Sequence, residues 1–214
     1  IQAELTQMEH HCELINMGDL KNKGIINYYT GDEIGKMAYG TGDIPFIRTS
    51  DFSNWEIKHD PKQGISEEIY RQYAEKQDVR EHDLLLVRDG TYLVGTSCII
   101  TKYDSKSLFC GGLYKIRCNE WEYLDPYLLL GLLNSYIVKR QIRTKQFTRD
   151  VIDTIGNRID EIVVPIPKNP QIKKKISSFI RDIVESRIKS REEISKLTKL
   201  VIDPSYQIQV GTPV

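Results

Sequence analysis

The segment that most constrains the fold runs from Pro170 to about Val201 and has the pattern of one long helix. Six of eight positions at alternating spacings of four and three residues are apolar, namely Ile176, Ile180, Ile183, Ile194, Leu197 and Val201. This spacing is typical of a coiled-coil seam. Because the chain offers no second long helix, we expect the seam to pack against another chain or another part of the parent protein. The alternative is a helix that lies along its own globular domain.

The rest of the chain predicts an α+β domain that is largely β. Strands are expected at residues 44–47, 84–88, 93–101, 113–118 and 159–167, and helices at 66–77 and 125–142. Ser66 and Asp125 are suitable helix N-caps, and Pro126 suits a first helical position. We therefore divide the chain into a linker or the end of a preceding domain (1–11), a globular domain (12–168), the long helix (169–201) and a tail (202–214).

Two polar tips stand out against the apolar strands. Asp89-Gly90 is a turn signal between two apolar runs, so Arg88, Thr91 and Tyr92 are expected at the tip of a hairpin. A second tip follows the short strand at 44–47, where Arg48, Thr49 and Ser50 come together. Residues 18–43 are rich in Gly and Asp and suggest short strands and loops.

The net charge of zero hides two opposed parts. Residues 1–138 carry 21 Asp and Glu against 14 Lys and Arg, whereas residues 139–199 carry 16 Lys and Arg against 8 Asp and Glu. Such a split favours a polyanion contact on the basic part. The densest stretch, here called the basic track, has five cations and no acid within 11 residues: Lys139, Arg140, Arg143, Lys145 and Arg149. For the lysines after residue 168 we favour a solvated helix face.

Several function classes lack support. There is no apolar run of 18 residues and no signal peptide, and the four cysteines form no C-x-x-C pair, so a reduced cytoplasmic protein is expected. No metal or cofactor site is predicted. "TGDEIGKM" is one residue short of a phosphate loop, and Met37 stands where Ser or Thr should be. One enzyme alternative stays open, namely a metal-dependent nuclease that uses Asp51, Glu56 and Lys58.

Four segments together resemble the target recognition domain of type I restriction-modification specificity subunits. They are "GDIPFIRTSDFSN" (42–54), "EHDLLLVRDGTYLVGTS" (81–97), "YLDPYLLLGLLNSYIVKRQI" (123–142) and "TIGNRIDEIVVPIP" (154–167) before the long helix. The resemblance covers roughly residues 12–200. It implies a non-catalytic domain that reads one half of a split double-stranded DNA site. Partners that it implies are an adenine methyltransferase, a restriction subunit, and a second recognition domain bound through the long helix.

The resemblance also assigns roles to the polar residues. Arg88, Thr91 and Tyr92 at one tip, and Arg48, Thr49 and Ser50 at the other, would face the bases. The basic track would contact phosphates, with Gln146 and Thr148 as further base readers. An ion pair between Arg88 and Asp89 or Asp83 is the structural alternative for that arginine.

The chain departs from the family pattern, because a full specificity subunit has two recognition domains and two long helices. The parent is therefore half a specificity subunit, a half-length form that dimerises, or, as we favour, an adenine methyltransferase with a fused recognition domain. A protein-interaction module built on the long helix, with no role at DNA, is a second rival to the DNA-binding hypothesis. The DNA target does not follow from the sequence.

Overall fold

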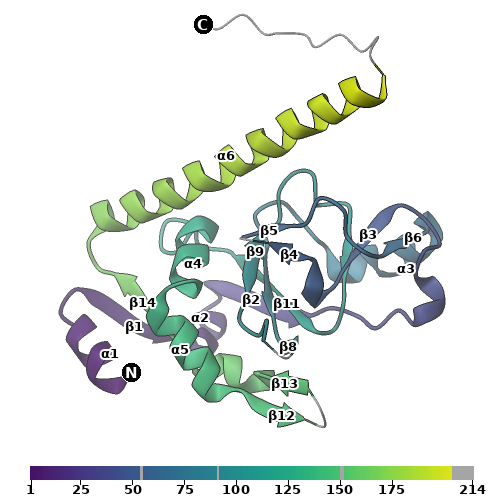
Figure 1. Cartoon of the computed structure of the whole chain (residues 1–214). Helices are drawn as coiled ribbons and strands as arrows, with labels where there is room; N and C mark the ends of the chain where they lie inside the picture. Colours follow the sequence, from purple (N-terminus) through teal and green to yellow (C-terminus); the bar gives the residue numbers. More distant parts are fainter. Residues whose placement is uncertain (54, 91, 150–151, 204–214) are drawn as a thin grey trace, which may run out of the picture.

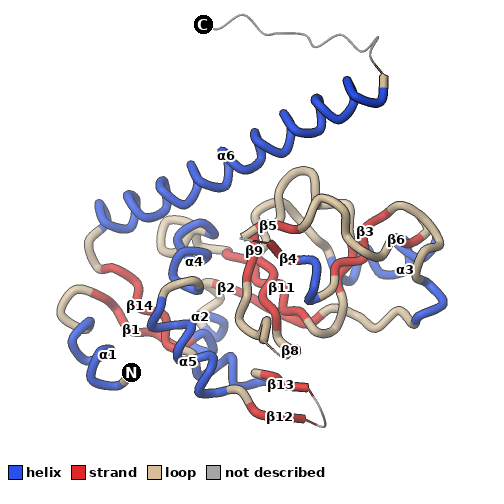
Figure 2. Tube along the Cα trace, viewed as in Figure 1, coloured by secondary structure: helices blue, strands red, loops and turns tan. Residues whose placement is uncertain are grey.

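A four-stranded antiparallel sheet lies at the centre of the domain in the computed structural model, which describes residues 1–53, 55–90, 92–149 and 152–203 (Figures 1 and 2). In spatial order its strands are β2 (Ile26–Thr30), β11 (Leu113–Cys118), β7 (Leu84–Val87) and β9 (Ser97–Ile99). In β7, Leu84 and Leu86 face one hydrophobic cluster, and Leu85 and Val87 face another. Burial on both faces explains why this strand is an unbroken apolar run.

One face of the sheet is covered by short strands and one helix. Its hydrophobic cluster includes Phe46, Phe109 and Leu85, all essentially buried. Helix α3 begins where the sequence predicts, because the Ser66 hydroxyl accepts a hydrogen bond from the Ile69 backbone N–H at 3.3 Å. The elements here are η1 (Lys36–Ala38), β3 (Ile44–Ile47), η2 (Thr49–Asp51), β4 (Phe52–Ser53), β5 (Glu56–Ile57), β6 (Gly64–Ile65), α3 (Glu67–Gln77) and β10 (Leu108–Phe109).

The other face carries the larger cluster, to which the N-terminal segment contributes. Leu5 is buried in this cluster, and Glu4 forms an ion pair with Arg140 at 3.0 Å. The segment 1–11, expected to be a linker or the end of a preceding domain, thus packs on the domain through these residues. The elements are α1 (Gln2–Met8), β1 (Cys12–Asn16), α2 (Met17–Asn22), α4 (Pro126–Leu133), α5 (Tyr136–Lys145), η3 (Gly156–Glu161) and β14 (Val163–Pro167), with β1 and β14 paired antiparallel.

Helix α6 (Pro170–Ile202) buries apolar side chains against the domain mainly in its first half. Ile180 is buried against Gly131 of α4, where a side chain on the glycine would begin 3.1 Å from the isoleucine. Ile176 is partly buried beside it. The expectation that Ile180 packs on another chain is thus wrong, because α4 already covers it. Figure 1 shows the helix running obliquely above the domain and rising away from it toward its C-terminal end.

The second half of α6 is held to the domain by polar contacts, while its seam residues stay open. Arg187 pairs with Glu56 at 3.0 Å, and Arg191 with Asp104 at 3.3 Å. Ile183 is half-buried, whereas the exposed fractions are 61% for Ile194, 57% for Leu197 and 82% for Val201. The residues of the coiled-coil pattern therefore fall into two groups. Ile176 and Ile180 pack against the domain, whereas Ile194, Leu197 and Val201 are exposed to solvent.

A buried lysine anchors α3 to the central sheet. The Lys115 ammonium donates to the backbone oxygens of Gln77 and Asp78, at 2.5 and 2.6 Å, where α3 ends. A cation at a helix C-terminus suits the helix dipole. Its other neighbour is the carboxylate of Asp83, 3.5 Å away, which also accepts from Arg117. Burial lowers the pKa of Lys115 to about 8.

The α+β prediction is confirmed, but several local expectations are wrong, among them a strand from residue 159, where the chain is still in η3. The helix expected at 125–142 is two helices, because the Asn134 amide bonds the Leu130 carbonyl and Ser135 is extended, so that a new helix begins at Tyr136. Within residues 18–43, α2 is a helix rather than a strand or loop. Strands β7 and β9 do pair, but Asp89-Gly90 is strand β8 and not a two-residue turn. Among the described residues, no helix is long and apolar enough to cross a membrane.

Candidate nucleic-acid interface

A second small sheet joins two segments that the sequence treats separately. Strand β8 (Asp89–Gly90) pairs antiparallel with β13 (Ile152–Thr154), which pairs with β12 (Phe147–Arg149). The β7–β9 loop (residues 88–96) and the end of the basic track therefore belong to one sheet, in which β13 lies between them. Figure 1 shows this sheet below the central sheet, on the side away from α6. We call this side the loop face.

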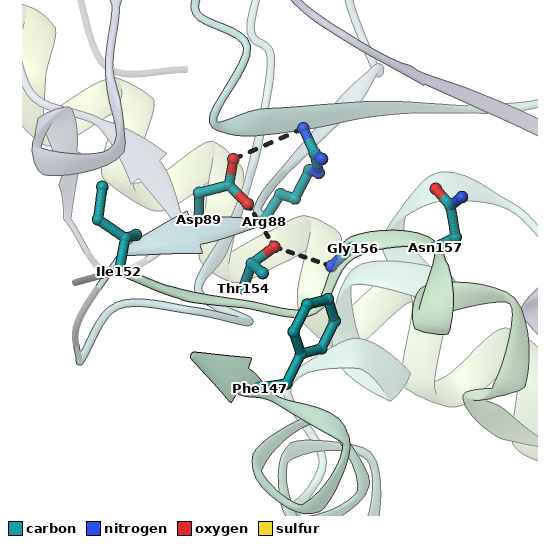
Figure 3. A pocket seen from close by; sticks show the side chains of 7 residues that line it. All are labelled: Arg88, Asp89, Phe147, Ile152, Thr154, Gly156 and Asn157. Atoms are coloured by element: carbon teal, nitrogen blue, oxygen red, sulfur yellow. Dashed lines mark hydrogen bonds and ion pairs between the residues drawn. The ribbon is translucent and has the colours of Figure 1, made fainter. Parts of the chain in front are cut away.

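The loop face has two cavities that share Asp89 and Ile152. One, of about 310 Å³, lies between β8 and the β12–β13 pair. Its lining residues are Arg88, Asp89, Phe147, Ile152, Thr154, Gly156 and Asn157 (Figure 3). The other, of about 420 Å³, lies between the β7–β9 loop and the end of β3.

The second cavity brings the two polar tips together. Arg48 and Thr49 line it from one side, and Gly90 and Tyr92 from the other. The Arg48 guanidinium lies 5.6 Å from the centre of the Tyr39 ring, a cation–π distance. Tyr92 is 87% exposed. A tyrosine this open at a loop end is available to pack on a sugar or base.

Arg88 points inward instead of outward. Its Nη1 donates to the Gly111 carbonyl at 3.2 Å and lies 3.5 Å from the Asp89 carboxylate, and its guanidinium lies 5.8 Å from the Tyr114 ring centre. Its Nε is buried without a partner among the described residues. The ion pair with Asp89, the structural alternative for this arginine, is present, whereas Asp83 binds Arg117.

Most of the basic track is engaged within the domain. Lys139 on α5 donates to the Gly95 carbonyl at 2.6 Å, and burial, with Arg143 nearby, lowers its pKa. Arg140 pairs with Glu4, and Lys145 pairs with Glu161 at 2.6 Å. Arg143 is exposed, and no salt bridge among the described residues involves it.

The remaining predicted site residues lie on or beside the loop face. Gln146 ends α5 and leads into β12, and the Thr148 hydroxyl donates to Asp153 at 2.9 Å. Arg149 is the last residue of β12. Ser50 is exposed in η2 next to Thr49. Thr91 lies outside the described residues.

The three residues of the nuclease alternative each have another structural partner. Asp51 is buried and accepts a hydrogen bond from the Arg48 backbone N–H at 2.8 Å, which organises the tip. Glu56 pairs with Arg187 of α6, and the Lys58 ammonium donates to the Ser50 carbonyl at 2.7 Å. Within the part of the chain that the structure describes, no group of three or more His, Cys, Asp or Glu residues is placed to hold a metal ion.

Four residues of the loop face were missed by the sequence reasoning. Phe147 and Ile152 are 42% and 48% exposed although they are large and apolar. Asp89 and Asn157 line the first cavity beside them. A signal was present, since Phe147, Thr148, Ile152 and Thr154 are residue types that favour strands.

Several solved structures share the fold of this chain. The chain matches the crystal structure of a type I restriction-modification S subunit from M. genitalium with a TM-score of 0.59 and 10% identity, over 87% of this chain and 42% of that one. It matches the HsdS subunit from Thermoanaerobacter tengcongensis with a TM-score of 0.52 and 13% identity, over 85% and 39%. It also matches a chain from a structure of the type I R-M system with a TM-score of 0.53 and 14% identity, over 89% of this chain and 44% of that one.

The sequence itself identifies the family. The model of the type I restriction modification DNA specificity domain matches residues 14–199, so the chain belongs to this family. The resemblance found in the four motifs is confirmed. No curated protein matches the chain. The chain spans less than half the length of the solved subunits that it matches.

Proposed function

We propose that the chain binds double-stranded DNA sequence-specifically through its loop face and directs adenine methylation and restriction by partner subunits or domains. The observation that carries this proposal is the convergence of three polar segments, at 48–50, 88–92 and 146–149. They are far apart in sequence, yet β8 pairs with β13 and both tips line one cavity. Loops on a rigid scaffold are where binding residues concentrate. The chain itself would carry no catalysis.

The residues on this face divide by the groups they would contact. Arg143 is exposed and unpaired among the described residues, so we assign it to phosphates, which position the protein without reading sequence. Arg48, Thr49 and Tyr92 line or border a cavity, and we assign them to the bases, with Gln146 and Thr148 beside them. An arginine can form two hydrogen bonds with guanine, and threonine offers a hydroxyl and a methyl.

The open part of α6 would serve association. Ile194, Leu197 and Val201 form an exposed apolar stripe on the second half of α6, and each would contribute roughly 1.5–3 kcal/mol if fully buried by another helix. We propose that a second long helix covers this stripe and that the methyltransferase partner binds the assembled subunit. The small sheet of the loop face and helix α6, which carries this stripe, lie on different sides of the domain (Figure 1).

A salt titration tests the DNA-binding proposal. The complex with wild-type chain should bind duplexes with an affinity that falls steeply as salt rises. Arg143→Ala should reduce that salt slope by about 0.9 and weaken all sequences alike. Arg48→Ala should cost about 1–3 kcal/mol on the preferred site and much less on a scrambled duplex. Wild-type binding without salt dependence or sequence preference would refute the proposal and favour the protein-interaction rival.

A further inference from the structure

Asp89 holds an unusual place for an acid, since it separates the two cavities of the loop face. It lines both of them, together with Ile152. Its backbone is fixed by pairing with Thr154 and by a hydrogen bond from its N–H to the Gly112 carbonyl at 3.1 Å. Its side chain is 30% exposed. The carboxylate is thus held rigidly at the surface that we propose for DNA.

The surroundings keep this carboxylate in one orientation and leave it able to accept more hydrogen bonds. The Thr154 hydroxyl donates to Oδ1 at 2.5 Å, and Arg88 lies 3.5 Å from Oδ2 (Figure 3). The Thr154 oxygen in turn accepts from the Gly156 N–H at 2.9 Å. A carboxylate has about four acceptor sites, so sites remain for a ligand.

The chemistry of this position excludes a phosphate and fits a base. A carboxylate repels a phosphate group, whereas it accepts hydrogen bonds from exocyclic amino groups. Only cytosine N4 and adenine N6 offer such a donor in the major groove. Phe147 and Ile152 add apolar walls on the first cavity. We propose that Asp89 is a specificity-determining residue that accepts a hydrogen bond from the amino group of one cytosine or adenine, while Arg88 orients it from behind.

This inference rests on the proposed DNA binding and reverses the expected roles of two neighbours. Arg88 was assigned to the bases, but its contacts to Gly111, Asp89 and Tyr114 make it a positioning residue. An acid on a DNA-binding face also weakens binding to every sequence that offers it no amino group. Asp89 would therefore gain selectivity by rejecting wrong sites as well as by accepting the right one.

The test is the isosteric change Asp89→Asn, made in the complex that the full chain forms with its methyltransferase partner. A preferred site is first selected from random duplexes with wild-type complex. On that site the variant should bind about 5- to 150-fold more weakly, the range for one good base contact. On a scrambled duplex it should bind equally well or more tightly, because a repelling charge is gone. Repeated selection should show one cytosine or adenine position that has become degenerate.

Two controls separate this role from a structural one. Thr154→Val removes the hydrogen bond to Asp89 but keeps the carboxylate, so the selected base should stay the same. Glu33→Gln removes an exposed charge from the second cavity and should change both duplexes alike. Equal losses on both duplexes for Asp89→Asn, or an unchanged selected site, would overturn the inference. Absence of sequence-dependent binding by the wild-type complex would instead refute the proposed function itself.

Discussion

Lys139 is expected to hold the β7–β9 loop in place and to make no phosphate contact, although it stands first in the basic track. Its ammonium donates to the Gly95 carbonyl at 2.6 Å. Gly95 has φ +83°, and a side chain there would begin 2.8 Å from Ile142 of the same helix. Helix α5 thus anchors the loop that carries Asp89 and Tyr92. Lys139→Met keeps the apolar stem and removes only the anchoring group.

The size of the effect follows from the bond that is lost. A hydrogen bond from a charged donor contributes about 1.5–3 kcal/mol, which corresponds to about 10- to 150-fold in an equilibrium. If the loop then leaves its binding-competent position in some molecules, the apparent affinity for the preferred site is the intrinsic affinity multiplied by the fraction of molecules whose loop stays in that position. The β8–β13 pairing and the packing of Gly95 on Ile142 still hold the loop, so the loss should be near the lower end.

The assay compares Lys139→Met with Arg143→Ala by salt titration on preferred and scrambled duplexes. Lys139→Met should weaken the preferred duplex and leave both the scrambled duplex and the salt slope unchanged. Arg143→Ala should lower the slope by about 0.9 and weaken both duplexes. A slope that drops by this amount in Lys139→Met, with equal losses on the two duplexes, would show that Lys139 contacts phosphate and that its bond to Gly95 is incidental.

Three further outcomes are expected. Gly95→Ala should lower both the thermal stability and the DNA preference, because its left-handed backbone and its close neighbour leave no room for a side chain. Gly24→Ala is the control, since Gly24 also has a left-handed backbone (φ +73°) but lies in open space, and thermal melting should show only the cost of backbone strain. Because burial lowers the pKa of Lys115 to about 8, this side chain binds fewer protons in the folded than in the unfolded chain between about pH 8 and 10.5. The contribution of Lys115 to the free energy of unfolding should therefore rise with pH over this window, so in urea titrations the stability of wild type relative to Lys115→Met should increase from about pH 8 to 10.5. Leu197→Asp should abolish association, measured by sedimentation, while the domain stays folded. Ile180→Asp should instead destabilise the domain itself, because Ile180 is buried. Normal assembly of Leu197→Asp would contradict the proposed role of the stripe.

Local signals predicted the elements that depend on local interactions. Helix α3 has its N-cap at Ser66, and α6 has a long apolar period, so both were found from the sequence within a residue of their ends. The strand at 113–118 was found with the same bounds. Elements that exist only through distant contacts were missed. Strand β8 has two residues and forms because β13, more than 60 positions later, supplies its hydrogen bonds.

The candidate site shows the same limit at the level of side chains. Sequence reasoning chose arginines and lysines as DNA contacts because cations bind phosphates. It could not foresee that Lys139 meets a backbone carbonyl, since this contact depends on how the loop returns to the sheet. The ion pair of Arg88 with Asp89 was an open alternative, and it is present. Asp89, which we propose as a base reader, has the opposite charge and was considered only as part of a turn and as a partner of Arg88.

The separation of the loop face from α6 has a consequence for how specificity can change. The central sheet is buried on both faces and lies between β8 and the helix, so the two surfaces share a rigid scaffold but no side-chain contact that the structure records. Energetic effects of changes at distant sites without shared partners usually add. Substitutions at Asp89 should therefore alter the DNA preference without altering association through Leu197, and a double variant should show the sum of the two single effects. Such independence would let the loop face vary while assembly is kept.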